Sequence, residues 1–132
     1  MNVPVSKSLH TRRLGNLRRL LKPRHVAFIG GKGLAAPIQG CLSGGFTGQI
    51  WPVHPTYPEI AGIKCYRSVE ALPEAPDASY IAAPREPTIE IVRALAKRGA
   101  GGCVCYAAGF AEVGPEGAAL QKALVEAAGE LA

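Results

Sequence analysis

The sequence lacks the features that mark membrane, secreted and metal-binding proteins. No apolar run approaches the roughly 20 residues that cross a bilayer, and no apolar segment of a secretory signal follows the basic N-terminus. The four cysteines, at positions 41, 65, 103 and 105, form no CxxC pair, which leaves a zinc site or a redox dithiol without support. We therefore expect a cytoplasmic protein with reduced thiols and no membrane partner.

Acidic and aromatic residues are also scarce. The 132 residues include 15 Lys and Arg against 10 Asp and Glu, a net charge of +5, and only 6% are aromatic. Much of the excess precedes residue 25, at Lys7, Arg12, Arg13, Arg18, Arg19, Lys22 and Arg24. Such a cluster suits either a nucleic-acid or acidic-lipid patch or a solvated helix face. Because no nucleic-acid signature accompanies it, we expect a solvated helix and no nucleic-acid partner.

What the sequence does contain is an alternation of apolar strands and amphipathic helices. Strands are predicted at 25–29, 49–53, 78–82 and 102–106, and helices at 11–21, 34–42, 88–98 and 115–131. Between the second and third strands we expect an extended piece at 63–66 and a helical turn at 68–72. The strands are apolar throughout, which is typical of strands buried on both faces of a parallel sheet. This predicts an α/β fold, a Rossmann-like doubly wound parallel sheet in three layers, α/β/α.

The chain has the size of one domain, with 48% hydrophobic residues and its glycines and prolines at segment ends. We divide it into a basic tail and helix start at 1–13 and a single domain at 14–132. The last predicted element is a helix, where a β–α–β pattern calls for another strand. We therefore expect the N-terminal fragment of a longer chain.

The stretch 25–40, HVAFIGGKGLAAPIQG, carries the clearest chemical signal. Ligands of doubly wound sheets bind beyond the carboxyl ends of the strands, and here the first strand runs into the turn Gly30, Gly31, Lys32, Gly33 and Leu34. Its backbone N–H groups can approach a phosphate, and the helix N-terminus adds about half a positive charge. The match to GxGxxA also fits a tight turn without a ligand. The absence of GxxxxGK[ST] argues against nucleoside triphosphate hydrolysis at this turn.

The end of the second strand narrows the choice of cofactor. An NAD site places Asp or Glu there to bind the ribose hydroxyls, but this chain has Val53, His54, Pro55 and Thr56, with no carboxylate before Glu59. The missing anion removes repulsion against a phosphorylated ribose, which both NADP and coenzyme A carry. NAD is therefore disfavoured, whereas NADP and coenzyme A both stay open.

Five segments occur in order along the chain: LRRLLKPRHVAFIGG, GFTGQIWPVHP, IAGIKCYRSVEALPEAPD, YIAAPREPTIEIVRALAKRGAGG and AAGFAEVGPEGAAL. Together they resemble the CoA-binding domain of NDP-forming acyl-CoA synthetases, which is related to the alpha subunit of succinyl-CoA ligase. The likeness covers residues 14–132 and implies coenzyme A as the cofactor. Two departures stand out. The family often has Asn-Pro-Lys after the second strand, where this chain has no lysine, and its loop after the first strand is often longer.

The resemblance implies three groups of cofactor-binding residues. The pyrophosphate would lie at residues 31–33 of the glycine turn, with Gly30 and Leu34 also counted in the site. The adenosine part would lie beside Val53, His54 and Pro55. The pantetheine arm would lie near Ala83, Pro84, Arg85, Gly109 and Phe110.

The resemblance also implies an acid–thiol ligase as the parent, which forms acyl-CoA from an acid, coenzyme A and ATP through acyl phosphate and phosphohistidine. In the family that histidine belongs to the following domain, and none of His10, His25 and His54 lies in a matching motif. No nucleophile constellation or metal-ligand cluster is visible in the sequence. We therefore expect ligase and ATP-grasp domains as partners, and neither catalytic residues nor activity in this chain alone.

Three other functions stay open at this stage. The alternatives are a non-catalytic coenzyme A or nucleotide sensor, the CoA-binding part of a protein acetyltransferase, and an NADP-binding module. The residues do not determine the acyl substrate, the preference for ADP or GDP, or the oligomeric state, a homo-oligomer included.

Overall fold

The computed structural model describes residues 5–107 and 109–132, and within them the side chains of residues 5–8 and of Lys32 lie outside the description. The helices are α1 Val5–Leu21, α2 Ala35–Ser43, α3 Arg85–Arg98 and α4 Pro115–Ala128. The strands are β1 His25–Gly30, β2 Gln49–Val53, β3 Glu59–Ile60, β4 Ile63–Lys64, β5 Ala78–Ala82 and β6 Gly102–Cys105. Three short 3₁₀ turns complete the chain, η1 Lys32–Leu34, η2 Val69–Ala71 and η3 Ala111–Val113.

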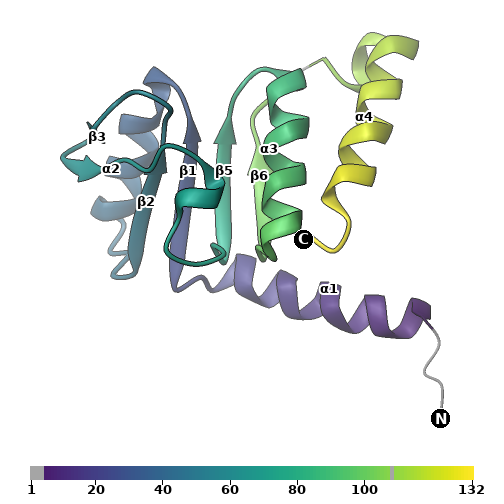
Figure 1. Cartoon of the computed structure of the whole chain (residues 1–132), viewed down its shortest axis with the longest axis horizontal. Coiled ribbons are helices and arrows are strands. Elements are labelled where there is room, and N and C mark those ends of the chain that lie inside the picture. The colour runs from purple at the N-terminus through teal and green to yellow at the C-terminus, as the bar shows by residue number, and fades with distance from the viewer. Residues whose placement is uncertain (1–4, 108) are drawn as a thin grey trace.

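The main sheet is parallel and has the strand order β2-β1-β5-β6. The chain moves outward from β1 to β2, then returns across β1 to β5, so the direction of winding reverses between β1 and β5. Figure 1 shows α2 behind the sheet, α3 in front of it and α4 beside α3 at the β6 edge, while α1 runs beneath the amino ends of the strands. The predicted doubly wound, three-layer fold is confirmed.

The hydrophobic core lies on both faces of β1, because successive strand residues point to opposite sides of a sheet. Ala27 and Ile29 pack into the cluster beneath α3, which also contains Val92 and Leu95. Phe28 packs into the other cluster, which is covered by α2. A central strand of this kind explains why the sequence is apolar without alternation.

The expectation of burial on both faces is wrong for β6. Val104 on this strand is 50% exposed. The reason lies in the helix placement, since α2 covers the part of the back face formed by β1 and β2 (Figure 1), whereas α3 lies on the front face with α4 beside it. The apolar character of a strand therefore did not reveal which of its faces a helix covers.

Two helices begin earlier than predicted. Helix α1 begins at Val5 instead of residue 11. Helix α3 begins at Arg85 instead of residue 88, with Pro87 in its first turn. Proline is tolerated there because the first N–H groups of a helix have no intrahelical partner. The N–H of Thr88 then donates to the Pro84 carbonyl at 2.9 Å, which closes the first turn.

A buried carboxylate joins α1 to the amino ends of the strands. Asp77 is 2% exposed and accepts hydrogen bonds from Arg19 Nε at 2.8 Å and Arg24 Nε at 2.9 Å. Burial by itself would raise the pKa of Asp77, but the hydrogen bonds from Arg24 and Arg19 outweigh it and hold this pKa well below its usual range. The N–H of Asp77 donates to His25 Nδ1 at 3.0 Å, and the His25 ring stacks on Trp51. His25 therefore has a packing role at the base of the sheet.

Candidate functional site

The glycine turn after β1 contains glycines with different physical roles. Gly30 has φ +155°, and a Cβ on it would lie 2.2 Å from the carbonyl oxygen of Ala82 on β5. Only glycine permits this approach of β1 to β5. The requirement for Gly30 is thus explained by strand packing, although the residue also lies at the edge of a pocket described below.

Gly31 and Gly33 face open space instead. A Cβ on either residue would meet no atom within 4 Å, so neighbouring protein atoms do not require glycine at these positions. The turn leads through η1 into α2, whose first N–H groups lack intrahelical partners. Leu34 differs, because its side chain is fully buried in the core beside Ile38, which leaves only its backbone for a ligand. The predicted contact by Lys32 concerns a side chain outside the described part of the structure.

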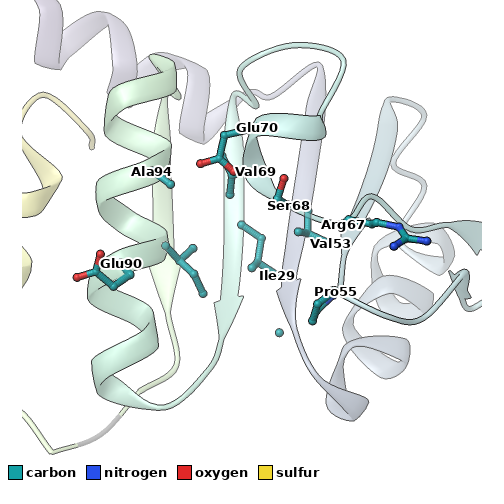
Figure 2. A pocket seen from close by; sticks show the side chains of 11 residues that line it. Ile29, Val53, Pro55, Arg67, Ser68, Val69, Glu70, Glu90 and Ala94 are labelled. Carbon is teal, nitrogen blue, oxygen red and sulfur yellow. The ribbon is translucent and has the colours of Figure 1, made fainter.

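A pocket of about 350 Å³ opens at the carboxyl ends of β1 and β2, on the face that carries α3. Figure 2 shows its position between the strand ends, η2 and α3. Most of the lining is apolar, with charged side chains at the rim. The lining residues are Ile29, Gly30, Val53, Pro55, Arg67, Ser68, Val69, Glu70, Glu90, Ile91 and Ala94. Three of the predicted site residues, Gly30, Val53 and Pro55, are therefore brought together in one pocket.

One wall of the pocket is held in place by an arginine from α3. Arg98 donates from Nη1 to the carbonyl of Glu70 at 2.7 Å and from Nη2 to the carbonyl of Leu72 at 2.6 Å. These bonds fix η2 against the last turn of α3. Charge-assisted hydrogen bonds to carbonyl oxygens are stronger than neutral ones, so the wall formed by Ser68 and Val69 is well anchored.

The loop after β2 uses its histidine for its own structure. His54 Nδ1 accepts hydrogen bonds from the N–H groups of Thr56 at 3.1 Å and Tyr57 at 3.0 Å. The His54 ring stacks on the Tyr57 ring with a centroid distance of 3.8 Å. His54 does not line the pocket, so its predicted contact with the ligand stays a prediction. Because Nδ1 is already hydrogen-bonded, the ring could make that contact only through Nε2.

The predicted residues at the ends of β5 and β6 form a second group, outside the pocket. Arg85 donates from Nη1 to the carbonyl of Gly109 at 2.7 Å and from Nη2 to Glu116 at 3.2 Å. The first bond joins the start of α3, which follows Ala83 and Pro84, to the loop after β6, and the second joins it to α4. Because the Arg85 guanidinium is already paired, its predicted contact with the pantetheine arm would require it to exchange partners.

The loop after β6 also satisfies its own polar groups. The Glu112 carboxylate accepts hydrogen bonds from the N–H groups of Gly109 at 2.7 Å and Phe110 at 3.1 Å. Backbone hydrogen bonds from Glu112 itself, Gly109 and Phe110 lower the pKa of Glu112. The Phe110 side chain is buried. This half of the strand edge therefore offers a ligand fewer open donors than the glycine turn does.

Sequence reasoning did not find the pocket residues of η2 and α3. The sequence predicts a helical turn around Ser68 and a helix around Glu90, and it indicates no binding role for either residue. Arg67 lies in a segment of no defined structure in the sequence. Their shared position depends on how α3 packs beside η2, which no local sequence pattern records.

A parallel sheet with a pocket at its carboxyl edge, beside a glycine turn, defines a nucleotide-cofactor-binding domain. The family described as CoA binding domain matches residues 36–131, which is more than half of the chain. The chain belongs to this CoA-binding domain family, and the predicted cofactor, coenzyme A, is confirmed at that level. The match begins just after the glycine turn, so the contribution of that turn stays a prediction.

The similar proteins are acyl-CoA-forming enzymes by name. The chain is 42% identical to the trans-feruloyl-CoA synthase FCS1 of an unknown prokaryotic organism, over 90% of this chain and 18% of that protein. It is 36% identical to acetate–CoA ligase [ADP-forming] I of Archaeoglobus fulgidus, over 85% of this chain and 17% of that protein. The chain thus spans less than a fifth of the length of these two relatives.

A solved structure agrees with the sequence comparisons. The dinucleotide forming acetyl-coenzyme A synthetase 1 of Ca. Korarchaeum cryptofilum is 31% identical, with a TM-score of 0.77 over 85% of this chain and 25% of that one. The predicted resemblance to NDP-forming acyl-CoA synthetases is therefore confirmed. Within residues 5–107 and 109–132, no helix is long and apolar enough to cross a membrane, and no three His, Cys, Asp or Glu side chains form a candidate metal site.

Proposed function

We propose that this chain supplies the coenzyme A site of an NDP-forming acyl-CoA synthetase. The observation that carries the proposal is the apolar pocket of about 350 Å³ at the carboxyl ends of β1 and β2. It borders β1, next to which the winding reverses, and doubly wound sheets bind their ligands beyond the carboxyl ends of their strands. No carboxylate follows directly on β2, since residues 54–58 are HPTYP, and this favours a cofactor with a phosphorylated ribose.

The three parts of coenzyme A fit different parts of this edge. The adenosine would occupy the pocket between Val53 and Ile91, where apolar side chains can cover its ring. The pyrophosphate would lie against the backbone N–H groups at Gly31 and Gly33, where an added Cβ would meet no described atom within 4 Å. The pantetheine arm would continue past β5 toward the loop of Gly109.

The parent reaction proposed here joins an acid to coenzyme A with cleavage of a nucleoside triphosphate. The relatives whose names include ADP-forming acetate–CoA ligase support this class. Because the chain spans less than a fifth of those two proteins, we assign acid activation, phosphohistidine chemistry and nucleotide binding to further domains of a parent. We also propose that the parent works in the cytoplasm, where coenzyme A and nucleoside triphosphates are both available.

Calorimetric titration of the chain with coenzyme A, NAD, NADPH and ATP tests the binding proposal. We expect coenzyme A to bind with a Kd of about 10–100 μM, which is about 5.5–7 kcal/mol. Such modest affinity is expected because the chain provides part of a composite site. NAD should bind more weakly. Binding of NAD as tight as that of coenzyme A would contradict the proposal, and a preference for NADPH would favour the NADP-binding alternative.

Incubation of the chain with labelled ATP, Mg²⁺, acetate and coenzyme A tests whether catalysis belongs to other domains of the parent. We expect neither labelled protein nor acetyl-CoA. Phosphoryl transfer requires a nucleophile and a bound metal–nucleotide complex, and His25 is buried with its Nδ1 already hydrogen-bonded. A stable phosphohistidine at His25 or His54 would show that the chain is catalytic and would overturn this assignment.

A further inference from the structure

Coenzyme A carries a phosphate on its adenosine ribose, and a dianion bound to protein is stabilised by a cation with hydrogen-bond donors. The loop directly after β2 provides no lysine or arginine for this phosphate. His54 accepts hydrogen bonds from the backbone of its own loop and is followed by Pro55 and Thr56. A cation for this phosphate has to come from another segment that reaches the same rim of the pocket.

The segment after β4 reaches that rim. Tyr66 forms a parallel bridge with Val53. The N–H of Tyr66 donates to the Pro52 carbonyl at 2.8 Å, and the N–H of His54 donates to the Tyr66 carbonyl at 2.9 Å. Tyr66 thus extends the carboxyl edge of the sheet beside β2. The next residue, Arg67, leaves the edge beside the His54 turn although it is more than ten positions away in sequence.

Arg67 lines the pocket, and its side chain is exposed. Within the described residues it makes no hydrogen bond or ion pair with the protein. The neighbouring arginines of α3 differ, because Arg98 binds carbonyls of η2 and Arg93 is paired with Glu90. Lys64 lies over the Tyr66 ring, 5.3 Å from its centroid, and does not line the pocket. Arg67 is the cation of the pocket lining that is free to bind an anion.

The charges of the pocket are arranged on two sides. Figure 2 shows Glu70 and Glu90 on the side of η2 and α3, and Arg67 on the side of Val53 and Pro55, with its guanidinium directed away from the apolar centre. The carboxylates would repel a dianion from their side. At the outer rim near Arg67, a phosphate would remain partly hydrated and meet a positive charge.

We propose that Arg67 binds the ribose 3′-phosphate of coenzyme A and thereby sets the preference for coenzyme A over its 3′-dephospho form. This rests on the proposed function, since it assigns one contact within the coenzyme A site. The adenine and the pyrophosphate would be bound by other groups, so Arg67 acts on specificity more than on binding of the nucleotide as a whole.

Calorimetry with coenzyme A and dephospho-coenzyme A tests the proposal on the unaltered chain, Arg67→Ala, Arg67→Lys and the matched control Lys64→Ala. The unaltered chain should prefer coenzyme A by about three- to fivefold, the upper part of the range for an ion pair at an exposed site. Arg67→Ala should lose this preference by weakening coenzyme A alone, and Arg67→Lys should restore part of it. Lys64→Ala should leave both affinities within about twofold, as expected of an exposed charge outside the pocket.

The outcomes separate this proposal from the one on which it rests. If the unaltered chain binds neither form, the coenzyme A site itself is wrong, and the role of Arg67 is wrong with it. If coenzyme A binds but Arg67→Ala keeps the original preference, only the role of Arg67 is overturned. Loss of the preference in Lys64→Ala instead would assign the phosphate to Lys64. Circular dichroism of each variant identifies any that fail to fold, and an unfolded Arg67→Ala would contradict the exposed, unpaired state described above.

Discussion

Polar groups are paired within the protein at the amino ends of the parallel strands and left open at the carboxyl ends of β1 and β2. At the amino ends, the buried Asp77 carboxylate is surrounded by donors from Arg19 and Arg24. At the carboxyl ends of β1 and β2, the backbone at Gly31 and Gly33 faces open space, and Arg67 has no protein partner within the described residues. Unpaired polar groups cost little at a wet edge and become useful when a charged ligand arrives. One end of the sheet therefore stabilises the fold, and the other is left available for binding.

The two halves of the carboxyl edge also differ in how far their polar groups are already paired. Its β1–β2 half has the pocket and the open glycine turn, whereas its β5–β6 half is closed by Arg85 and by Glu112. We infer that most of the affinity of this chain for coenzyme A comes from the β1–β2 half. Groups that already bind one another gain less from a ligand, since each new contact replaces an existing one.

The largest expected effect comes from the amino end. Asp77→Ala removes the buried acceptor of Arg19 Nε and of the Arg24 side chain and N–H, although Arg19 keeps other acceptors. The loss of these charge-assisted hydrogen bonds should cost about 3 kcal/mol. Urea unfolding followed by circular dichroism measures the loss. Glu126→Ala, at an exposed position of α4, should change the free energy of unfolding by less than about 0.5 kcal/mol. A loss below about 1 kcal/mol for Asp77→Ala would mean that this end of the sheet does not stabilise the fold.

The same carboxylate makes stability depend on pH. The pKa of Asp77 is lowered in the folded chain, so below pH ~4 the unfolded chain binds the proton more readily than the folded one does. Its contribution is fully present above the unfolded pKa and is lost as the pH falls through the lower folded pKa. We expect the free energy of unfolding to fall with pH below about 4, and Asp77→Asn to have a shallower dependence there. Equal slopes would contradict this assignment.

Gly30 and Gly33 belong to one turn but differ in how closely other atoms surround them. Gly30→Ala places a Cβ 2.2 Å from the Ala82 carbonyl oxygen at a positive φ, and overpacking of this kind costs about 1–3 kcal/mol. Gly33→Ala meets no neighbour within 4 Å and should alter stability by less than about 0.5 kcal/mol. Thermal and urea unfolding of both variants compare them directly. Equal losses would show that both glycines are required by the fold.

The sequence predicted the fold well because its apolar strands alternate with amphipathic helices along the chain. The bounds of β2 and β5 were predicted correctly, since both strands lie between clear turn signals. The exposed face of Val104 could not be predicted, because it depends on which side of the sheet the later helices occupy. The extended piece predicted at 63–66 contains β4, but β3 and its pairing with β4 were not predicted, as these strands are only two residues long.

The candidate site was predictable only where it follows from strand ends. Gly30, Val53 and Pro55 could be placed at one edge because parallel strands end there together. Ser68 and Glu90 could not, since they reach the pocket through the packing of η2 against α3. The sequence also could not tell that Gly30 serves the packing of strands, as the contact with Ala82 joins residues about fifty positions apart.

The smallest expected effect separates binding from folding at the open end. Gly33→Val adds a branched side chain beside the backbone N–H groups that would meet the pyrophosphate, at a position where the protein itself offers no obstruction. We expect the affinity for coenzyme A to fall about tenfold, or 1.4 kcal/mol, with the fold intact by circular dichroism. Gly40→Val is the matched control, because Gly40 lies within α2, is exposed and also meets no atom within 4 Å of its Cβ. Its affinity should be unchanged. If a folded Gly33→Val chain binds coenzyme A as the unaltered chain does, the pyrophosphate does not lie on this turn.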